Sequence, residues 1–175
     1  CELGADWENA SISELCDHIE TVHHRHLRQE LPRLNGLLGK VVEVHRAAHP
    51  ELDELQQSFA RLRTALERHL RMEATVVMPA LRAIEKDCLP TDSPPEYLTQ
   101  LLRSLETDQA VVERELKLMR RLTHGYQLPP STCAAYGAML DGFWELEWHL
   151  HKSVHEEDEF LFPRARRRDA LLHGA

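Results

Sequence analysis

Apolar residues recur along most of the chain at spacings of three and four positions, the periodicity of an amphipathic helix. The capping-box sequence Ser11-Ile12-Ser13-Glu14 predicts the start of a first helix. This helix runs to about His45, and Pro32 predicts a kink or a restart inside it. No convincing alternation of apolar and polar positions indicates a β-strand.

Three further helices follow the same pattern. The second is predicted from His49-Pro50 to about Asp87, where the stretch LPTDSPPE ends it. The third opens at Ser93-Pro94-Pro95-Glu96, which pairs a cap with early prolines, and the fourth runs from near Ser131 to just past Pro163. Four helices with short connections predict an all-α, up-down-up-down four-helix bundle.

The domain organisation follows from these elements. Residues 1–10 are interpreted as an N-terminal lead-in, residues 11–165 as the bundle, and residues 166–175 as a basic, fraying C-terminal tail. With 175 residues, the chain is long enough for one domain with a proper core.

Each predicted helix has an apolar stripe that faces the core, with one or two polar interruptions. The second stripe, for example, includes Val76, and the fourth includes Phe160. The polar interruptions are His24 and His45 in the first helix, His69 and Glu73 in the second, Gln109 in the third, and Ser153 and Glu157 in the fourth.

Buried carboxylates and imidazoles need a physical reason, because an unpaired buried carboxylate normally takes up a proton. His69 and Glu73 are four residues apart and share one helix face, within reach of one ion. A single inward histidine is more often a hydrogen-bonded core residue, but inward groups on three facing stripes favour a metal site. We expect His18, His23, His26, His151 and His155 to lie on solvated or boundary faces.

Composition narrows the possible partners. A formal net charge of −8 argues against nucleic acid, since binding a phosphate backbone requires a basic surface. The four cysteines are scattered, which favours a reducing compartment and a cytoplasmic location. No apolar run approaches the roughly 20 residues of a membrane helix, so no membrane partner is expected. The 12 histidines are the unusual feature.

Two stretches, HLRMEATVVMP at 69–79 and HLHKSVHEEDEFLFP at 149–163, resemble each other. In both, a glutamate precedes a proline by six residues, and an apolar pair stands just before the proline. Four residues before the glutamate, the first stretch has His69 and the second has Ser153. The second stretch is therefore either half of a metal site that has lost a ligand or a coincidence between histidine-rich helices.

The segments DWENASISELCDHIETVHHRHLRQELPRL, VVEVH, HLRMEATVVMPAL, PPSTC and EEDEFLFPRA together resemble the hemerythrin-like HHE cation-binding domain. Within it, the chain is most similar to the repair-of-iron-centres di-iron proteins, which are linked to iron–sulfur cluster repair after nitrosative and oxidative stress. The resemblance extends from about Trp7 to Ala165 and is weakest in the third helix. These proteins usually carry an upstream cysteine-containing domain as well.

The resemblance implies an iron site with ligands from all four helices. Its ligand positions fall on His24 in the first helix, His69 and bridging Glu73 in the second, and bridging Glu157 in the fourth, with His45 as an auxiliary histidine. The third-helix and fourth-helix histidine positions hold Gln109 and Ser153 instead, and His149, one turn before Ser153, is a possible substitute.

Three states of the site are therefore open. It could bind two metals, with water or Gln109 filling the gaps, or one metal through the remaining ligands and His149. Alternatively, His24 and His69 could pair with Glu73 and Glu157 as a buried ionic cluster without metal. Iron is the expected metal, in a di-iron centre if both positions fill, with manganese or zinc as alternatives.

The expected function is that of a non-haem metal-binding protein that handles iron, O₂ or NO, in iron–sulfur cluster repair under stress. Its expected partners are a small diatomic ligand or an iron–sulfur protein. A ligand-depleted bundle that acts as a regulatory or protein-interaction module is the alternative from another class. A small redox enzyme, such as a peroxidase or NO reductase, is the third hypothesis, and a metal-binding or repair protein is expected ahead of a turnover enzyme.

Overall fold

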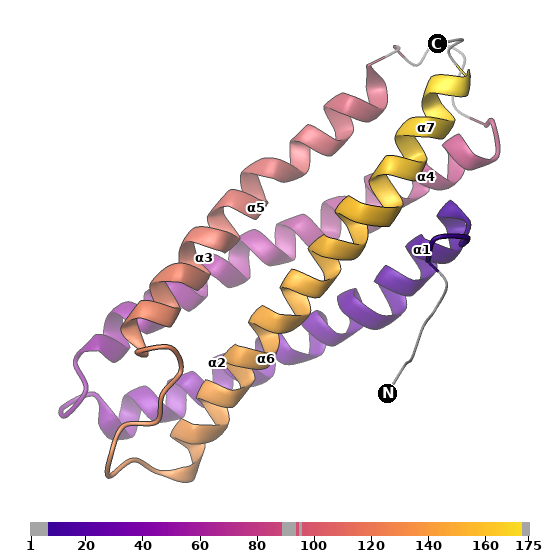
Figure 1. Cartoon of the computed structure of the whole chain (residues 1–175). Coiled ribbons are helices and arrows are strands. Elements are labelled where there is room, and N and C mark those ends of the chain that lie inside the picture. The colour runs from indigo at the N-terminus through magenta and orange to yellow at the C-terminus, as the bar shows by residue number, and fades with distance from the viewer. Residues whose placement is uncertain (1–6, 89–93, 95, 173–175) are drawn as a thin grey trace.

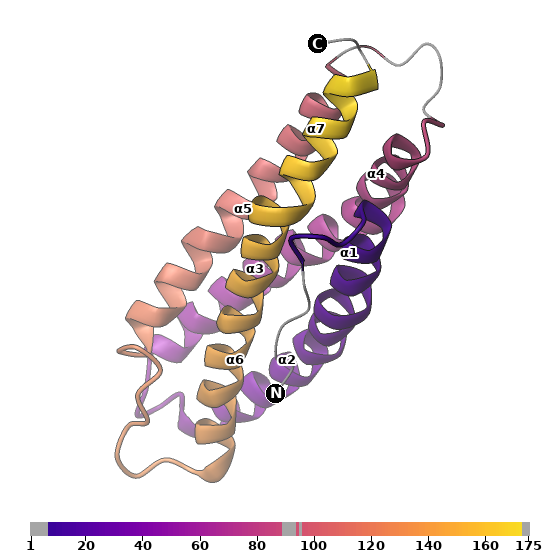
Figure 2. The same cartoon turned by 45° about the vertical axis from the view of Figure 1, so that its right-hand side comes forward.

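The computed structural model describes residues 7–88, 94 and 96–172. Within these residues the chain forms helices and turns without a strand, and four long helical rods lie side by side (Figures 1 and 2). None of the helices in this part of the chain has both the length and the apolar content needed to cross a bilayer. The predicted all-α bundle is confirmed.

The rods consist of several helical segments each. The first rod is α1 (Ile12–His18), η1 (Ile19–His24) and α2 (Arg25–His45); the second is α3 (Glu51–Met72), η2 (Glu73–Val77) and α4 (Met78–Glu85); the third is α5 (Tyr97–Leu122); the fourth is α6 (Ala134–Glu156), η3 (Glu157–Leu161) and α7 (Phe162–Leu172). The three η segments are π-helical turns.

Most predicted helix boundaries agree with these segments. The capping box is present, since Ser11 N–H donates to Glu14 Oε2 at 2.7 Å and Glu14 N–H donates to Ser11 Oγ at 3.1 Å. Helix α2 continues through Pro32. The predicted cap at Ser93 lies outside the described residues.

The predicted end of the fourth helix just past Pro163 is wrong, because α7 continues to Leu172. Buried Phe162 and Ala165 hold α7 against the bundle, and Arg168 forms an ion pair with Asp87 at 2.6 Å. Residues 166–172 are therefore helical, while the division into bundle and tail at residue 165 stays a prediction.

The hydrophobic core has two parts. One part lies among α2, α3, α5 and α6 and includes Phe59 and Phe143. The other lies among α1, α4, the first half of α5 and α7, and includes Met78 and Leu161. Buried polar residues of the η segments and their neighbours, His24, His69, Glu73 and Glu157 among them, separate the two parts along the bundle axis.

The three π turns occur where the inward polar residues lie. Segment η1 ends at His24, η2 begins at Glu73 and η3 begins at Glu157, whereas α5 has no such turn. A π turn adds one residue to the helical repeat, so the inward stripe beyond it shifts by one position. Val77 and Leu161 are fully buried, while Val76 is 37% exposed. The prediction that Val76 faces inward is therefore wrong, and Phe160 is only partly buried for the same reason.

Prolines help to explain two of these turns. Pro79 and Pro163 follow η2 and η3 and have no backbone N–H to donate to the carbonyl four residues earlier. That carbonyl belongs to Thr75 inside η2 and to Glu159 inside η3. The missing hydrogen bond weakens the α-helical pattern there, which favours the wider turn.

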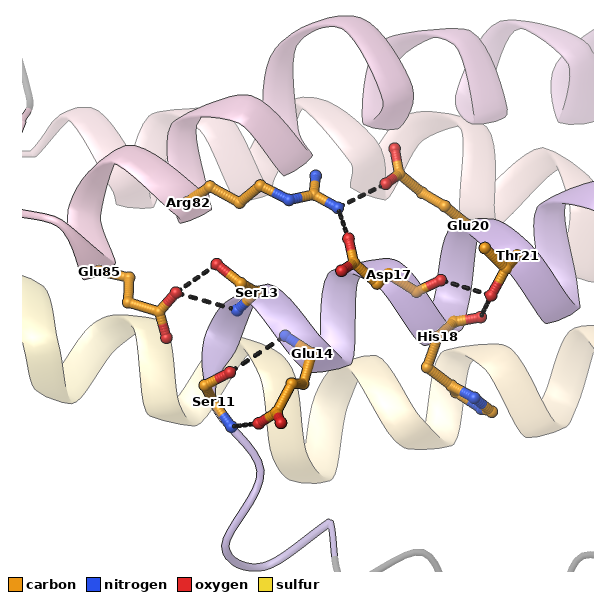
Figure 3. A network of polar contacts seen from close by, with 9 residues as sticks. All are labelled: Ser11, Ser13, Glu14, Asp17, His18, Glu20, Thr21, Arg82 and Glu85. Atoms are coloured by element: carbon orange, nitrogen blue, oxygen red, sulfur yellow. Dashed lines mark hydrogen bonds and ion pairs between the residues drawn. The ribbon is translucent and has the colours of Figure 1, made fainter.

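Helix α1 is attached to α4 by a polar network (Figure 3). Arg82 of α4 contacts Asp17 at 2.5 Å and Glu20 at 2.6 Å. Glu85 of α4 accepts the backbone N–H groups of Ile12 at 2.8 Å and Ser13 at 3.1 Å. These contacts hold the start of the first rod in register with the second.

Candidate metal centre

His24, Glu73 and Glu157 meet between the rods. Each offers one ligand atom, and these atoms all lie within 4.8 Å of one another. The three side chains are almost inaccessible, at 1%, 1% and 2% exposure. The structure thus brings together three of the four predicted ligands in a space that solvent does not reach.

Glu73 connects this cluster to the fourth predicted ligand. Its Oε2 lies 3.1 Å from Nε2 of His24, and its Oε1 lies 3.3 Å from Nε2 of His69. The two carboxylate oxygens therefore face two different imidazoles, as a carboxylate that bridges two cations must. His69 lies one turn before Glu73 on α3, which is why both reach the same space.

Several donor atoms here have no hydrogen-bond partner among the described residues. They are Nδ1 of His24, Nδ1 of His69 and Oε2 of Glu157, while Nε2 of His24 and Oε1 of Glu73 make only the contacts of 3.1 Å and 3.3 Å given above. Unpaired buried polar atoms are rare in folded proteins because each costs free energy. The residues present therefore fit a metal ion, for which His24, Glu73 and Glu157 would each supply one ligand atom.

The pKa values of Glu73 and Glu157 are shifted in opposite directions. Burial alone would raise the pKa of Glu73, but contacts with His24 and His69 outweigh it and hold that pKa well below its usual value. Burial and the nearby charge of Glu73 raise the pKa of Glu157. Without metal, Glu73 is therefore ionised and Glu157 keeps a proton, which a bound cation would displace.

Of the two positions where histidines are replaced, Ser153 contacts Glu157 and Gln109 lies with His69 at a pocket. Ser153 Oγ donates to Glu157 Oε1 at 2.8 Å, so it orients the carboxylate and leaves Oε2 free. Gln109 and His69 line a pocket of about 190 Å³ between α3, α5 and α6, together with His151 and Asp158. The His69 side of the centre therefore opens into a pocket, and the His24 side is closed.

His45 and His149 are not brought to the centre. His45 is the last residue of α2, a helix of 21 residues that begins directly after His24, so it lies about 30 Å away. It contacts Sγ of Cys133 at 3.2 Å instead. The ring of His149 packs on that of His26, with centroids 3.8 Å apart. Neither His45 as an auxiliary ligand nor His149 as a substitute fits this geometry.

A second polar cluster was missed by the sequence reasoning. His18, His23 and Glu156 form another group whose ligand atoms lie within 4.8 Å of one another. The expectation that His23 lies on a solvated or boundary face is wrong, since this residue is fully buried. Two doublets in the sequence, His23-His24 and Glu156-Glu157, could have indicated this cluster. Because a π turn widens the helix, two adjacent residues there can both face the interior.

The chain is similar in sequence to curated iron–sulfur cluster repair proteins. Its sequence is 28% identical over 148 residues to the "Iron-sulfur cluster repair protein ScdA" of Staphylococcus haemolyticus, covering 85% of this chain and 64% of that protein. It is 26% identical over 159 residues to the "Probable iron-sulfur cluster repair protein" of Haemophilus influenzae, covering 91% and 67%. Against the "Iron-sulfur cluster repair protein YtfE" of Escherichia coli O81, identity is 26% over 161 residues, covering 91% and 69%.

The chain spans about two thirds of the length of these curated relatives. The Hemerythrin HHE cation binding domain matches residues 17–165, a range that includes His24, Glu73 and Glu157. The chain belongs to the hemerythrin HHE cation-binding domain family.

Proposed function

We propose that this protein binds iron at His24, His69, Glu73 and Glu157 and acts in iron–sulfur cluster repair, as an iron-handling protein that can release its metal. The observation that carries the proposal is the set of ligand atoms of His24, Glu73 and Glu157, which are buried and lie within 4.8 Å of one another. The names of the relatives support the repair role, and a cytoplasmic location stays a prediction.

The ligand set favours iron over copper, because two carboxylates and two imidazoles form a mainly hard, oxygen-rich site. His24, Glu73 and Glu157 complete one position, whereas the second has only His69 and the other oxygen of Glu73. Ser153 and Gln109 take the places of two imidazoles. The chain is therefore expected to hold one metal ion firmly and a second one weakly.

The pocket beside His69 gives the weakly held position a route to solvent. Bound iron supplies redox chemistry and open coordination positions that suit a small diatomic ligand such as O₂ or NO. Gln109 lines this pocket and Ser153 donates to Glu157, and both side chains are weaker metal ligands than the histidines they replace. This asymmetry suits a protein that donates iron better than one that retains it.

One observation favours a metal-free module as the second candidate function. With a proton on Glu157 and the hydrogen bond from Ser153, the two buried carboxylates coexist without a cation. Such a bundle could fold and bind a partner without iron. The experiment below separates the two functions, and steady turnover of peroxide or NO would instead favour the redox enzyme.

Anaerobic titration with Fe(II), followed by elemental analysis, tests the proposal. We expect at least one tightly bound iron per chain and a higher melting temperature when iron is bound. Glu157→Gln should weaken the binding of this iron by about 100-fold or more, since loss of a mere outer-shell partner already costs about 10–100-fold. Glu159→Gln, an exposed position two residues away, is the matched control and should change nothing. A purified protein without iron, whose melting temperature Fe(II) leaves unchanged, would contradict the proposal.

A further inference from the structure

The second polar cluster consists of His18, His23 and Glu156. Nε2 of His18 lies 3.0 Å from Oε2 of Glu156, and Nε2 of His23 lies 2.8 Å from the same oxygen. The rings of His18 and His23 stand edge to face, with centroids 5.4 Å apart. Two imidazole nitrogens and one carboxylate oxygen therefore converge on one point, from α1, η1 and α6.

These distances match the coordination sphere of a divalent metal ion. Metal–ligand bonds of about 2.1 Å that meet at right angles place neighbouring donor atoms about 3.0 Å apart. The two distances to Glu156 agree with such edges without rearrangement of the backbone. Two histidines and one carboxylate on one side of an ion, with the remaining positions open, are the ligands of mononuclear non-haem Fe(II) sites.

The cluster is distinct from the central one. Each uses one member of the doublet His23-His24 and one member of the doublet Glu156-Glu157, so the two sites face different directions from the same turns. His23 is fully buried, and Glu156 is 5% exposed. The side chain of His18 is 14% exposed, which leaves an edge through which an ion can enter.

Trp7 covers this edge. Its ring lies 4.3 Å from the ring of His18, centroid to centroid. Arg164 of α7 donates to the carbonyl oxygens of Trp7 at 3.0 Å and Glu8 at 2.7 Å, which fixes the segment in place. Figure 3 shows the His18 ring pointing away from Arg82 toward the C-terminal helices. Trp7 is therefore placed to report on an ion bound by His18.

Lys152 is the competing cation. Its Nζ lies 3.9 Å from Oε1 of Glu156, the oxygen that the two histidines do not contact. The side chain of Lys152 is 39% exposed, and its Nζ lies 5.5 Å from the ring of Trp148. Lys152 thus competes with a metal ion for Glu156 from the oxygen that faces away from the histidines, and it leaves Oε2 to them.

We propose that His18, His23 and Glu156 form a second, mononuclear site for a divalent first-row transition metal ion, independent of the centre at His24, Glu73 and Glu157. Both histidines bind through Nε2 and Glu156 through Oε2, under the cover of Trp7. The simpler arrangement, in which both imidazoles only donate hydrogen bonds to Glu156, requires the same contacts and differs in its response to added metal.

Trp7 makes the test site-specific. In the full chain with Trp144→Phe and Trp148→Phe, Trp7 is the remaining tryptophan, and Co(II) bound at His18 will quench its fluorescence. Adding Glu157→Gln weakens the central site, so that failure of the proposed iron function and failure of this inference are distinguishable. In that protein we expect saturable quenching with one Co(II) per chain.

His23→Gln should weaken this Co(II) binding at least about tenfold. His18→Gln is the second variant and should do the same, because His18 lies at the edge of the cluster and its replacement leaves the core intact. His155→Gln, an exposed histidine of α6, is the matched control and should have no effect. Circular dichroism and thermal melting verify that each variant is folded. Absence of quenching in the Glu157→Gln protein, or unchanged quenching in folded His23→Gln and His18→Gln proteins, would overturn the inference.

Discussion

Glu115 and Glu157 are both buried glutamates, 1% and 2% exposed, but their surroundings differ. Glu115, on α5, accepts hydrogen bonds from Ser58 at 2.9 Å, Arg61 at 3.0 Å and Arg114 at 2.8 Å. Glu157 accepts one from Ser153 at 2.8 Å and faces a second carboxylate. The carboxylate of Glu115 is satisfied by the protein, whereas that of Glu157 requires a proton or a cation.

The same pairing with arginine recurs elsewhere. Glu147 is held by Arg120 at 2.5 Å and by the hydroxyl of Tyr126 at 2.8 Å, and Asp108 is held by Arg68. These carboxylates stabilise the contacts between rods. No arginine contacts Glu73 or Glu157 among the described residues. Pairing with arginine, more than burial, therefore distinguishes the structural carboxylates of this bundle from Glu73 and Glu157, the proposed metal ligands.

The largest expected effect is at Glu115. Glu115→Gln should destabilise the protein by about 2–3 kcal/mol, because it removes the charge from hydrogen bonds with two arginines. Burial raises the pKa of Glu115, but Arg61, Arg114 and Ser58 outweigh it and lower it to about 2. The unfolded value is about 4.3, so the contribution is complete above that pH and is lost as the pH falls toward 2. Urea unfolding of both proteins between pH 2 and 7 measures the difference, with exposed Glu113→Gln as the matched control.

The same substitution at Glu157 should have the opposite sign in the metal-free protein. Because its pKa is raised, folded Glu157 keeps a proton that the unfolded chain releases above about pH 4.3, so stability falls as the pH rises above that value. Glu157→Gln removes this loss and should stabilise the metal-free protein by about 1–2 kcal/mol at pH 7. Thermal melts in the presence of a chelator measure the gain, which should vanish below about pH 4. Equal destabilisation by the substitutions at Glu115 and Glu157 would erase the distinction between the two carboxylates.

The smallest expected effect is a change in Fe(II) affinity at Gln109. Gln109→His adds an imidazole at the wall of the pocket beside His69, where about 190 Å³ is available. Fe(II) affinity should rise about tenfold, or about 1.4 kcal/mol, because the weakly held position gains a ligand. Anaerobic competition with a chromophoric chelator measures this change. Gln109→Leu, of similar size but without a donor, should leave the affinity unchanged or lower.

Much of the fold could be predicted from the sequence, because helical periodicity and the capping box at Ser11 are local signals. His69 and Glu73 could be paired from their spacing alone. The π turns could not be predicted, since one extra residue per helix does not disturb the pattern enough to be seen. The misplacement of Val76 and the omission of His23 both follow from assuming a regular α-helix.

The predictions for His45 and His149 did not take into account where each side chain lies relative to the centre. His45 shares the inward face of the first helix with His24, but a common face does not place two residues close together. The rise of 1.5 Å per residue separates them by the whole length of α2. The orientation of His149 depends on packing against His26, which is 123 residues away in sequence and beyond the reach of any local pattern.

The three π turns lie at the level where one hydrophobic core ends and the other begins. Three of the four rods therefore have an irregular hydrogen-bond pattern between two separately packed halves, and α5 alone passes this level as a regular helix. Without a cation, polar contacts such as His24–Glu73 at 3.1 Å and His23–Glu156 at 2.8 Å join the rods at this level. A metal ion held by His24, Glu73 and Glu157 would link all three irregular turns at once. Its binding would then govern how cooperatively the bundle unfolds, while the shape of the bundle stays the same.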